Sequence, residues 1–434
     1  MTVGHPYGHK QAYLLPYLLP VTIKPNGHDM SYARNELYAY IGLSAVTPTQ
    51  YIVSMAMAIA IRSGATFCSV WAATQPWQRL VVDRRRRPLQ QPYSFATIST
   101  QLRWMIHSTS HKNGAVQAAA TEAELDDEVL LEAPAQFRIY KSGRMDRLNE
   151  PTLSPPGLDE ATGVTSRDVV LDADTGVSVR LYLPKLPDHH SPTKLPVLVF
   201  FHGGAFLLGS ADDAAYHNYV NALAAEAGVL AVSVDYRLAP EHPLPAAYDD
   251  SWAALRWAAS AQDGWIAEHG DLSRLFLAGD SAGANIVHDM LLRAASNDNS
   301  PRVEGAILLH PWFSGTTAVE GEPPAASKVT GMLWSYACPG AVGGADDPRM
   351  NPLAPGAPAL EKLGCVRMLV TAGLADGLAA RNRAYHDAVA GSGWRGTAAW
   401  LGSEGEGHVF FLGKPGCENA KQLMDRVVAF IAGA

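Results

Sequence analysis

Ser281 lies at the centre of the run Gly279-Asp280-Ser281-Ala282-Gly283, which follows a strand-like segment, Arg274 to Ala278, and opens a helix-like one, Ala282 to Ala295. This order predicts a nucleophile elbow, where a strand turns sharply into a helix and leaves the serine hydroxyl exposed. Only small neighbours tolerate the strained backbone of such a turn, and glycine and alanine stand around the serine. Five residues can match a motif by chance, so the partner residues decide the interpretation.

A serine nucleophile needs a general base, and the base needs an acid that orients it. Asp376 follows a buried-strand run at 366–371 and precedes a helix that we expect to begin near Leu378. His408 follows the flexible loop 402–407, after the expected last strand at 397–401. Serine, aspartate and histidine thus occur in the chain order of elbow-type triads. We predict that His408 deprotonates Ser281 and that Asp376 orients the imidazole.

Other roles for these two partners stay open. Asp376 could simply cap the following helix, because aspartate is favoured at that position. His408 could be a solvated or structural histidine. Glu406 is a rival acid, but it lies on the same loop two residues before His408, where it is poorly placed to orient the ring.

A second glycine-containing loop predicts donors for the oxyanion of an ester's tetrahedral intermediate. The strand-like run Pro196 to Phe201 leads directly into His202-Gly203-Gly204-Ala205, which matches the HGGG type except at its last position. We expect the N–H groups of Gly203, Gly204 and Ala282 to form the oxyanion hole. An ordinary glycine-rich turn is the alternative.

Large apolar side chains stand next to these motifs along the chain and are candidates for binding the substrate. An apolar wall suits an acyl chain or an aromatic alcohol, although buried aromatic residues often just fill a core. The candidates are Phe206, Leu207, Trp312, Phe313, Trp334 and Val409.

Several motifs together resemble one known family. They are the stretch Val234 to Asp250, the glycine loop, the run Gly279 to Asn285, and His310-Pro311-Trp312-Phe313. From about Asp127 to the C-terminus, the chain resembles plant carboxylesterases of the hormone-sensitive-lipase-like group. The resemblance implies an α/β-hydrolase fold with a small cap, and catalytic roles for Ser281, Asp376 and His408.

The order of strand-like and helix-like runs agrees with an α/β class. It predicts a mostly parallel central sheet with helices on both faces. Strand-like runs are expected near 167–171, 178–183, 196–201, 228–234, 274–278 and 303–309, and a helix at 246–260. The hydrolase domain is expected at 126–434, with cap elements near 126–150 and 312–349. Residues 1–125 are predicted to form a basic, poorly ordered extension, with a targeting segment or an addition to the cap as alternatives.

Composition limits the partners of the protein. The chain of 434 residues has a net charge of −8, but its first 120 residues hold eleven basic and three acidic side chains, so the catalytic part is strongly acidic and should repel nucleic acid. The apolar run Tyr51 to Ile61 is too short to span a membrane. The four cysteines indicate reduced thiols. We expect a cytoplasmic monomer or dimer without a secretory signal.

These features together predict a serine carboxylesterase that hydrolyses small or medium uncharged esters through an acyl-enzyme. No metal or organic cofactor is needed for that chemistry. Two alternatives come from relatives of the family. One is a lyase similar to 2-hydroxyisoflavanone dehydratases, and the other is a non-catalytic binding protein similar to gibberellin receptors. Those receptors lack the catalytic histidine, so the presence of His408 argues against the second alternative.

Overall fold

The computed structural model describes residues 128–433, except for 149, 187–193 and 297–299. The predicted basic extension, 1–125, and the apolar run Tyr51 to Ile61 therefore lie outside the described residues. Within the described ranges, no helix is both long and apolar enough to cross a bilayer.

An eight-stranded sheet forms the centre of the described domain, in the strand order β11-β10-β9-β8-β6-β7-β5-β4. The pairs from β11 to β7 are parallel, whereas β5 runs antiparallel to β7 and to β4. The strands are β4 (Thr165–Val170), β5 (Ser178–Leu183), β6 (Leu195–Phe201), β7 (Leu230–Asp235), β8 (Gly270–Asp280), β9 (Gly305–Leu309), β10 (Arg367–Gly373) and β11 (Thr397–Ser403).

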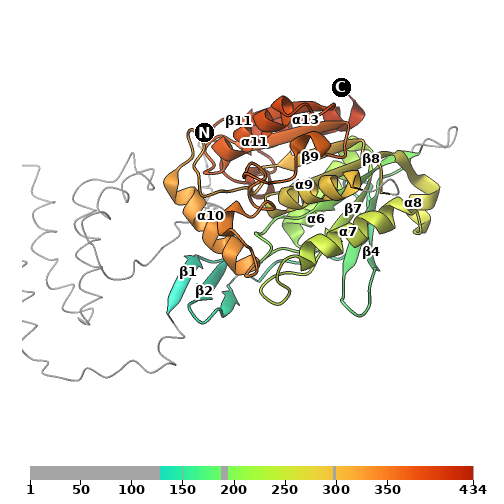
Figure 1. The fold of residues 1–434 in the computed structure, drawn as a ribbon. Helices are drawn as coiled ribbons and strands as arrows, with labels where there is room; N and C mark the ends of the chain where they lie inside the picture. The colour runs from blue at the N-terminus through green and yellow to red at the C-terminus, as the bar shows by residue number, and fades with distance from the viewer. Residues whose placement is uncertain (1–127, 149, 187–193, 297–299, 434) are drawn as a thin grey trace, which may run out of the picture. The chain divides into compact units, whose positions relative to one another are not determined.

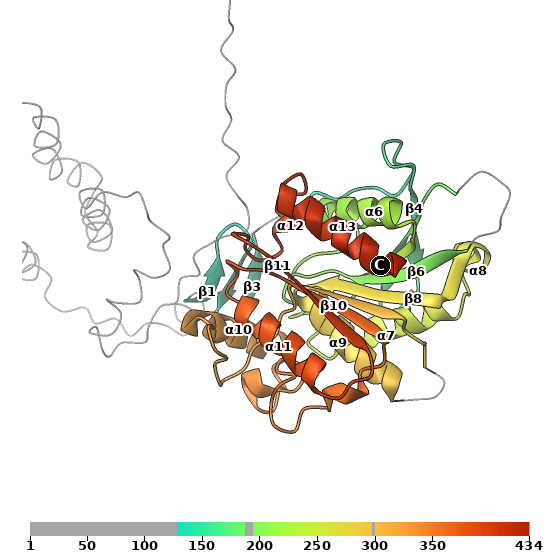
Figure 2. The same ribbon diagram turned by 90° about the horizontal axis from the view of Figure 1, so that it is seen from above.

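Helices cover both faces of this sheet (Figures 1 and 2). They are α6 (Ala214–Ala227), α7 (Ala246–Ala259), α8 (Gly264–His269), α9 (Ala282–Ala295), α10 (Pro324–Ala337), α11 (Ala379–Gly391), α12 (Phe410–Gly413) and α13 (Glu418–Ala432), with short 3₁₀ turns at η2 (Gly344–Asp346) and η3 (Leu360–Lys362). The arrangement confirms the predicted α/β-hydrolase architecture.

The buried strands fill a separate core on each face because successive side chains of a strand point in opposite directions. In β6, Val197 and Val199 pack in the core that contains residues of α7 and α9. Leu198 and Phe200 belong to the other core, beneath α6 and α13. Strands buried on both faces read as continuous apolar runs, which is why the sequence predicted them.

Some elements differ from the sequence-based expectation. The strand expected at 274–278 is longer, since β8 begins at Gly270 directly after α8. Glycine and aspartate, which occupy the first two positions of β8, are depleted in strands. Pairing with Leu195 and Pro196 of β6 nevertheless extends the strand, and the register shifts after Pro196. Helices α6 and α13 had not been singled out from the sequence.

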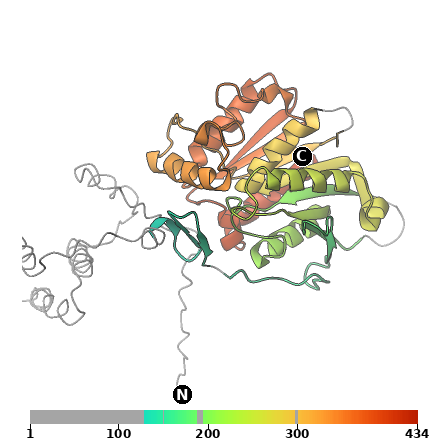
Figure 3. The same ribbon diagram turned by 60° about the horizontal axis from the view of Figure 1, so that its bottom comes forward.

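The two segments expected to form a cap contact each other. Residues 129–147 form a small antiparallel sheet of β1 (Val129–Ala133), β2 (Phe137–Tyr140) and β3 (Met145–Arg147), which lies beside α10 (Figures 1 and 3). The Tyr336 hydroxyl of α10 donates a hydrogen bond to the carbonyl of Gly143, at 2.7 Å. The N–H of Leu244 donates to the carbonyl of Ala337, the last residue of α10, at 2.9 Å.

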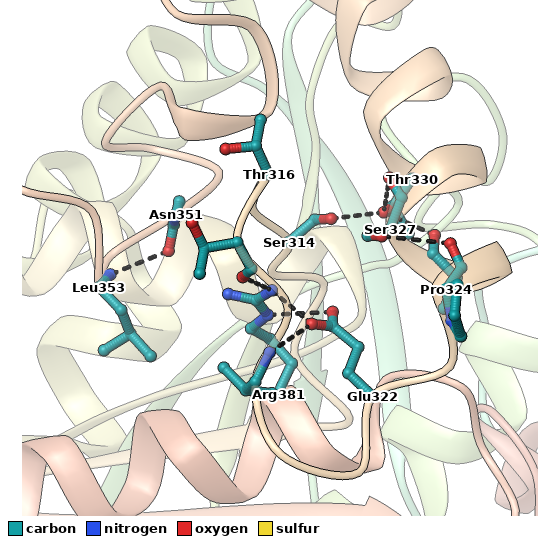
Figure 4. A network of polar contacts seen from close by, with 12 residues as sticks. Ser314, Thr316, Glu322, Pro324, Ser327, Thr330, Asn351, Leu353 and Arg381 are labelled. Atoms are coloured by element: carbon teal, nitrogen blue, oxygen red, sulfur yellow. Dashed lines mark hydrogen bonds and ion pairs between the residues drawn. The ribbon is translucent and has the colours of Figure 1, made fainter.

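A buried ion pair fastens the segment before α10 to α11 (Figure 4). The side chains of Arg381 and Glu322 are 2% and 1% exposed, and their closest atoms lie 2.5 Å apart. The Arg381 guanidinium also donates to the carbonyl of Thr317, at 2.9 Å. Both charges therefore have partners, as burial requires.

We predict that Glu322→Gln lowers the free energy of unfolding by about 3–5 kcal/mol, because it leaves the buried guanidinium of Arg381 without a counter-charge. The matched control is Asp387→Asn, which breaks an exposed pair with Arg383 on α11. The control should change stability by less than about 1 kcal/mol. Urea unfolding measures both, and equal effects of the two changes would contradict the importance of the buried pair.

Candidate active site

The backbone at Ser281 is strained in the way that a nucleophile elbow requires. Ser281 stands between β8 and α9 with φ 51° and ψ −115°, a conformation that costs a non-glycine residue about 1–3 kcal/mol. Close packing explains the glycines around it. A Cβ atom on Gly283 would lie 1.9 Å from the carbonyl oxygen of Phe201, and one on Gly279 would lie 2.5 Å from the carbonyl carbon of Gly283. The chain can turn here only because both positions lack side chains.

The structure brings the three predicted triad residues together. Nε2 of His408 lies 2.8 Å from Oγ of Ser281. Nδ1 of His408 lies 2.6 Å from Oδ2 of Asp376. Asp376 follows the carboxyl end of β10, and His408 follows β11, the neighbouring strand. The two loops therefore start side by side and reach the serine at the end of β8.

The charges in this chain of contacts are mutually supporting. Burial lowers the pKa of His408, but the charge of Asp376 and its hydrogen bond outweigh that effect and raise the pKa above its ordinary value. Burial raises the pKa of Asp376, but the charge and hydrogen bond of His408 hold it below its usual range. The geometry suits a histidine that takes a proton from Ser281 while an ionised carboxylate stabilises the resulting imidazolium.

The rival acid points elsewhere. A carboxylate oxygen of Glu406 lies 3.0 Å from Nζ of Lys414, and the other accepts a hydrogen bond from Asn419 at 3.2 Å. Asp376, and not Glu406, is the carboxylate that contacts His408.

The glycine loop differs from the prediction at Gly203. The N–H of Gly203 donates to Oδ1 of Asp280 at 2.9 Å and also lies 3.0 Å from the hydroxyl of Tyr216. This N–H is already used within the protein, so the expectation that it serves the oxyanion was wrong. Among the described residues, the N–H groups of Gly204 and Ala205 have no protein acceptor. The acceptor for Gly203 is a long-range contact, and the sequence motif alone gives no sign of it.

Buried polar side chains hold this loop against the elbow. Asp280 accepts from Gly203 and, at 3.2 Å, from the Tyr216 hydroxyl. The Tyr236 hydroxyl donates to the carbonyl of His202 at 2.6 Å, and the two rings stack with centroids 4.2 Å apart. The loop is thus fixed before any substrate arrives, which is the condition for electrostatic stabilisation of a transition state.

The predicted substrate-binding residues separate into groups. Phe206, Trp312 and Trp334 form one aromatic cluster, with ring centroids 5.9 to 6.3 Å apart. Phe313 packs instead on Tyr385, with centroids 4.7 Å apart. These four side chains are at most 3% exposed, as is Leu207, while Val409 is 8% exposed. Core packing, the alternative left open for these residues, accounts for their burial.

One group of side chains near the serine has the composition of a metal site. Ligand atoms of His310, Asp376 and His408 lie within 4.8 Å of one another. Hydrogen bonds already engage them: His408 and Asp376 bind each other, and Nδ1 of His310 accepts the N–H groups of Gly373 and Val409. The hydrogen bonds of Asp376 and His408 to each other, and of His310 to the main chain, therefore account for this cluster.

Comparison with known proteins identifies the family. A family model described as the alpha/beta hydrolase fold matches residues 198–412. Tuliposide A-converting enzyme 1 of Tulipa gesneriana is 44% identical over 331 residues, which cover 75% of this chain and 83% of that protein. This chain belongs to the α/β-hydrolases. The match confirms the resemblance to plant carboxylesterases of the hormone-sensitive-lipase-like group that the sequence motifs indicated.

Further relatives bear on the type of reaction. A 2-hydroxyisoflavanone dehydratase of Glycyrrhiza echinata is 40% identical and aligns over 72% of this chain and 99% of its own length. A probable carboxylesterase 2 of Arabidopsis thaliana is 39% identical over 70% of this chain and 96% of its own length. The crystal structure of esterase LipW from Mycobacterium marinum has a TM-score of 0.52 at 28% identity, covering 63% of this chain and 82% of that one. This α/β-hydrolase is a hydrolase of carboxylic esters.

We predict that Asp280→Asn removes a pH dependence of stability. Burial raises the pKa of Asp280 from 3.8 to about 7, so the folded protein holds this proton more tightly than the unfolded chain does. The contribution of Asp280 to the free energy of unfolding therefore decreases as the pH rises from about 4 to about 7. The amide of Asn keeps an acceptor for Gly203 but does not ionise. Urea unfolding at several pH values checks this, and an unchanged pH slope would contradict it.

Proposed function

We propose that this α/β-hydrolase cleaves its ester through an acyl-enzyme on Ser281. His408 takes the Ser281 proton on Nε2 as Oγ attacks the ester carbonyl carbon, and Asp376 holds the ring and stabilises its charge. The alcohol then leaves with the proton from His408. A water molecule, deprotonated by the same nitrogen, attacks the acyl-enzyme and restores the serine. The observation that carries this proposal is the continuous chain of contacts of 2.8 and 2.6 Å from serine to carboxylate.

The oxyanion of the tetrahedral intermediate is proposed to bind the N–H groups of Gly204, Ala205 and Ala282. Gly203 is not assigned this role, because its N–H donates to Asp280. Ala282 is the first residue of α9, so its N–H is one of those that a helix start leaves without an intrahelical acceptor. Ala205 has φ 56°, and its methyl group shows that a glycine is not required at this position of the loop.

We propose small or medium uncharged esters as substrates. Phe206, which follows the glycine loop, packs on Trp312 in the buried apolar core beside the elbow, with ring centroids 5.9 Å apart. A polar oxyanion hole in apolar surroundings favours an ester without charged groups next to the carbonyl. The cytoplasmic location and the monomeric or dimeric state stay predictions.

A lyase that eliminates water is the second candidate function. It is favoured by the 40% identity to a 2-hydroxyisoflavanone dehydratase, whose sequence aligns over 99% of its length. Assays of a 2-hydroxyisoflavanone and of a p-nitrophenyl ester with the same preparation distinguish the two. The receptor alternative is less well supported, because His408 is present and lies within hydrogen-bond distance of Ser281.

Substitutions of the triad test the mechanism. On p-nitrophenyl acetate, Ser281→Ala and His408→Ala should each lower kcat by on the order of 10⁴-fold or more, because either change removes the attack on the carbonyl. Glu406→Gln is the matched control and should stay close to the parental rate, since Glu406 contacts Lys414 and Asn419. Near-parental turnover in either alanine variant would defeat the assignment.

The pH profile adds a test of Asp376 within the same experiment. Activity requires neutral His408, so the acid limb of kcat/KM should have its midpoint above 6.5, the ordinary histidine value. Asp376→Asn removes the charge that raises this pKa. It should move the midpoint downward and lower kcat by roughly 10⁴-fold. An unmoved limb would show that another group sets the pKa of His408.

A further inference from the structure

His310 connects the two loops that carry the acid and the base. It follows β9, the strand between β8 and β10, and its ring is completely buried. Its Nδ1 atom accepts the N–H of Gly373 at 3.3 Å and the N–H of Val409 at 3.1 Å. Gly373 ends β10 three residues before Asp376, and Val409 directly follows His408. One nitrogen lone pair thus contacts the backbone of both loops.

The ring of His310 is suited to accept hydrogen bonds because it is neutral. Burial, and to a smaller extent the nearby charge of His408, lower its pKa to about 3, although the charge of Asp376 acts in the opposite direction. Nδ1 lies 3.9 Å from Oδ2 of Asp376, too far for a hydrogen bond, and that oxygen already contacts His408. The ring is enclosed by Phe410 and Phe411, each with its centroid 5.7 Å away. Because Nδ1 accepts, the proton of the neutral imidazole lies on Nε2, a buried atom that has no hydrogen-bond partner among the described residues.

The backbone of Val409, which donates one of the two hydrogen bonds to His310, is strained. Val409 has φ 42° and ψ 36°, a left-handed conformation that is a genuine outlier for a β-branched residue. Such a conformation persists only where the surrounding structure holds it. The hydrogen bond from the N–H of Val409 to His310 is a direct restraint on it. The residue under strain is the immediate neighbour of His408.

The loop that carries Asp376 and the loop that carries His408 also pack closely against each other, so a small displacement of one loop would move the other. A Cβ atom on Gly373 would lie 2.4 Å from the carbonyl oxygen of Gly407, and the N–H of Ala375 donates to the carbonyl of Glu406 at 2.9 Å. The acid loop and the histidine loop therefore pack as one unit above His310.

We propose that His310 is a positioning residue that sets the Asp376–His408 contact by accepting main-chain hydrogen bonds from both loops. It contacts neither substrate nor Ser281 in this role. The inference rests on the proposed function, since it assumes that His408 is the general base. Its energetic effect is geometric: a misplaced base loses rate even though every catalytic group is still present.

A pair of substitutions tests the role of the lone pair. Asn places a side-chain oxygen two bonds from Cβ, as His places Nδ1, so His310→Asn should keep the acceptor and most of the activity. His310→Phe keeps a ring without an acceptor. It should lower kcat on p-nitrophenyl acetate by on the order of 10- to 100-fold, with little change in KM. The matched control is His386→Phe on α11, whose ring contacts Asp387 and Trp400.

The pH profile supplies a readout that loss of stability alone would not move. The titratable groups that face His408 are Asp376, Asp280 and His310 itself. Neutral His310 contributes no charge, so its replacement alters the pKa of His408 only through the geometry of the Asp376 contact. The acid limb of kcat/KM should therefore move to lower pH in His310→Phe and stay in place in His310→Asn. Thermal unfolding of each variant shows that it is folded at the assay temperature.

The outcomes separate this inference from the proposed function. Parental kcat and an unmoved acid limb in His310→Phe would overturn the inference while the triad stands, provided that Ser281→Ala is inactive. If His310→Asn is impaired as strongly as His310→Phe, the acceptor role is wrong. If His310→Phe does not fold, His310→Asn decides. A parental kcat and an unmoved acid limb of kcat/KM in His310→Asn support the inference, whereas a lowered kcat with a shifted acid limb overturns it. Activity in Ser281→Ala would instead defeat the proposed function itself.

Discussion

The close contact between the end of β6 and the start of α9 is the constraint on which the site depends. The carbonyl oxygen of Phe201 occupies the space that a side chain on Gly283 would need, since a Cβ there would lie 1.9 Å away. This contact forces the turn at Ser281 and brings the loop after Phe201 next to the nucleophile. The register of the adjacent strands β6 and β8 reinforces this contact, because it pairs Phe201 with Gly279. This packing contact, together with the hydrogen bonds of Asp280 and Tyr236, positions the nucleophile and the oxyanion donors.

The remaining chemistry comes from neighbouring strands at the same edge of the sheet. Asp376 and His408 follow β10 and β11, and His310 follows β9, which separates them from the serine strand. Loops at the carboxyl ends of parallel strands converge in this way in open α/β sheets. The carboxyl group of Asp280 is buried, which raises its pKa, and it fixes the glycine loop by accepting the N–H of Gly203. The site combines rigid strands with short loops tied to one another by buried hydrogen bonds.

The sequence predicted the parts whose signals are local. Ser281, Asp376 and His408 were found because each follows an apolar strand run in a fixed chain order, and the sheet followed from continuous apolar segments. Gly203 was assigned wrongly because its acceptor, Asp280, lies 77 residues away along the chain. The role of His310 was missed for the same reason, although this residue begins the motif His310-Pro311-Trp312-Phe313. Long-range hydrogen bonds leave no periodic or positional trace in a single sequence.

The most direct test is to identify the residue that becomes covalently attached. The protein is incubated with an alkyl fluorophosphonate, digested and examined by mass spectrometry, with His408→Ala treated in parallel. We predict one stoichiometric adduct, on the peptide that contains Ser281, and a much slower reaction in the histidine variant. An adduct on another residue, or none at all while ester turnover is blocked, would contradict the account.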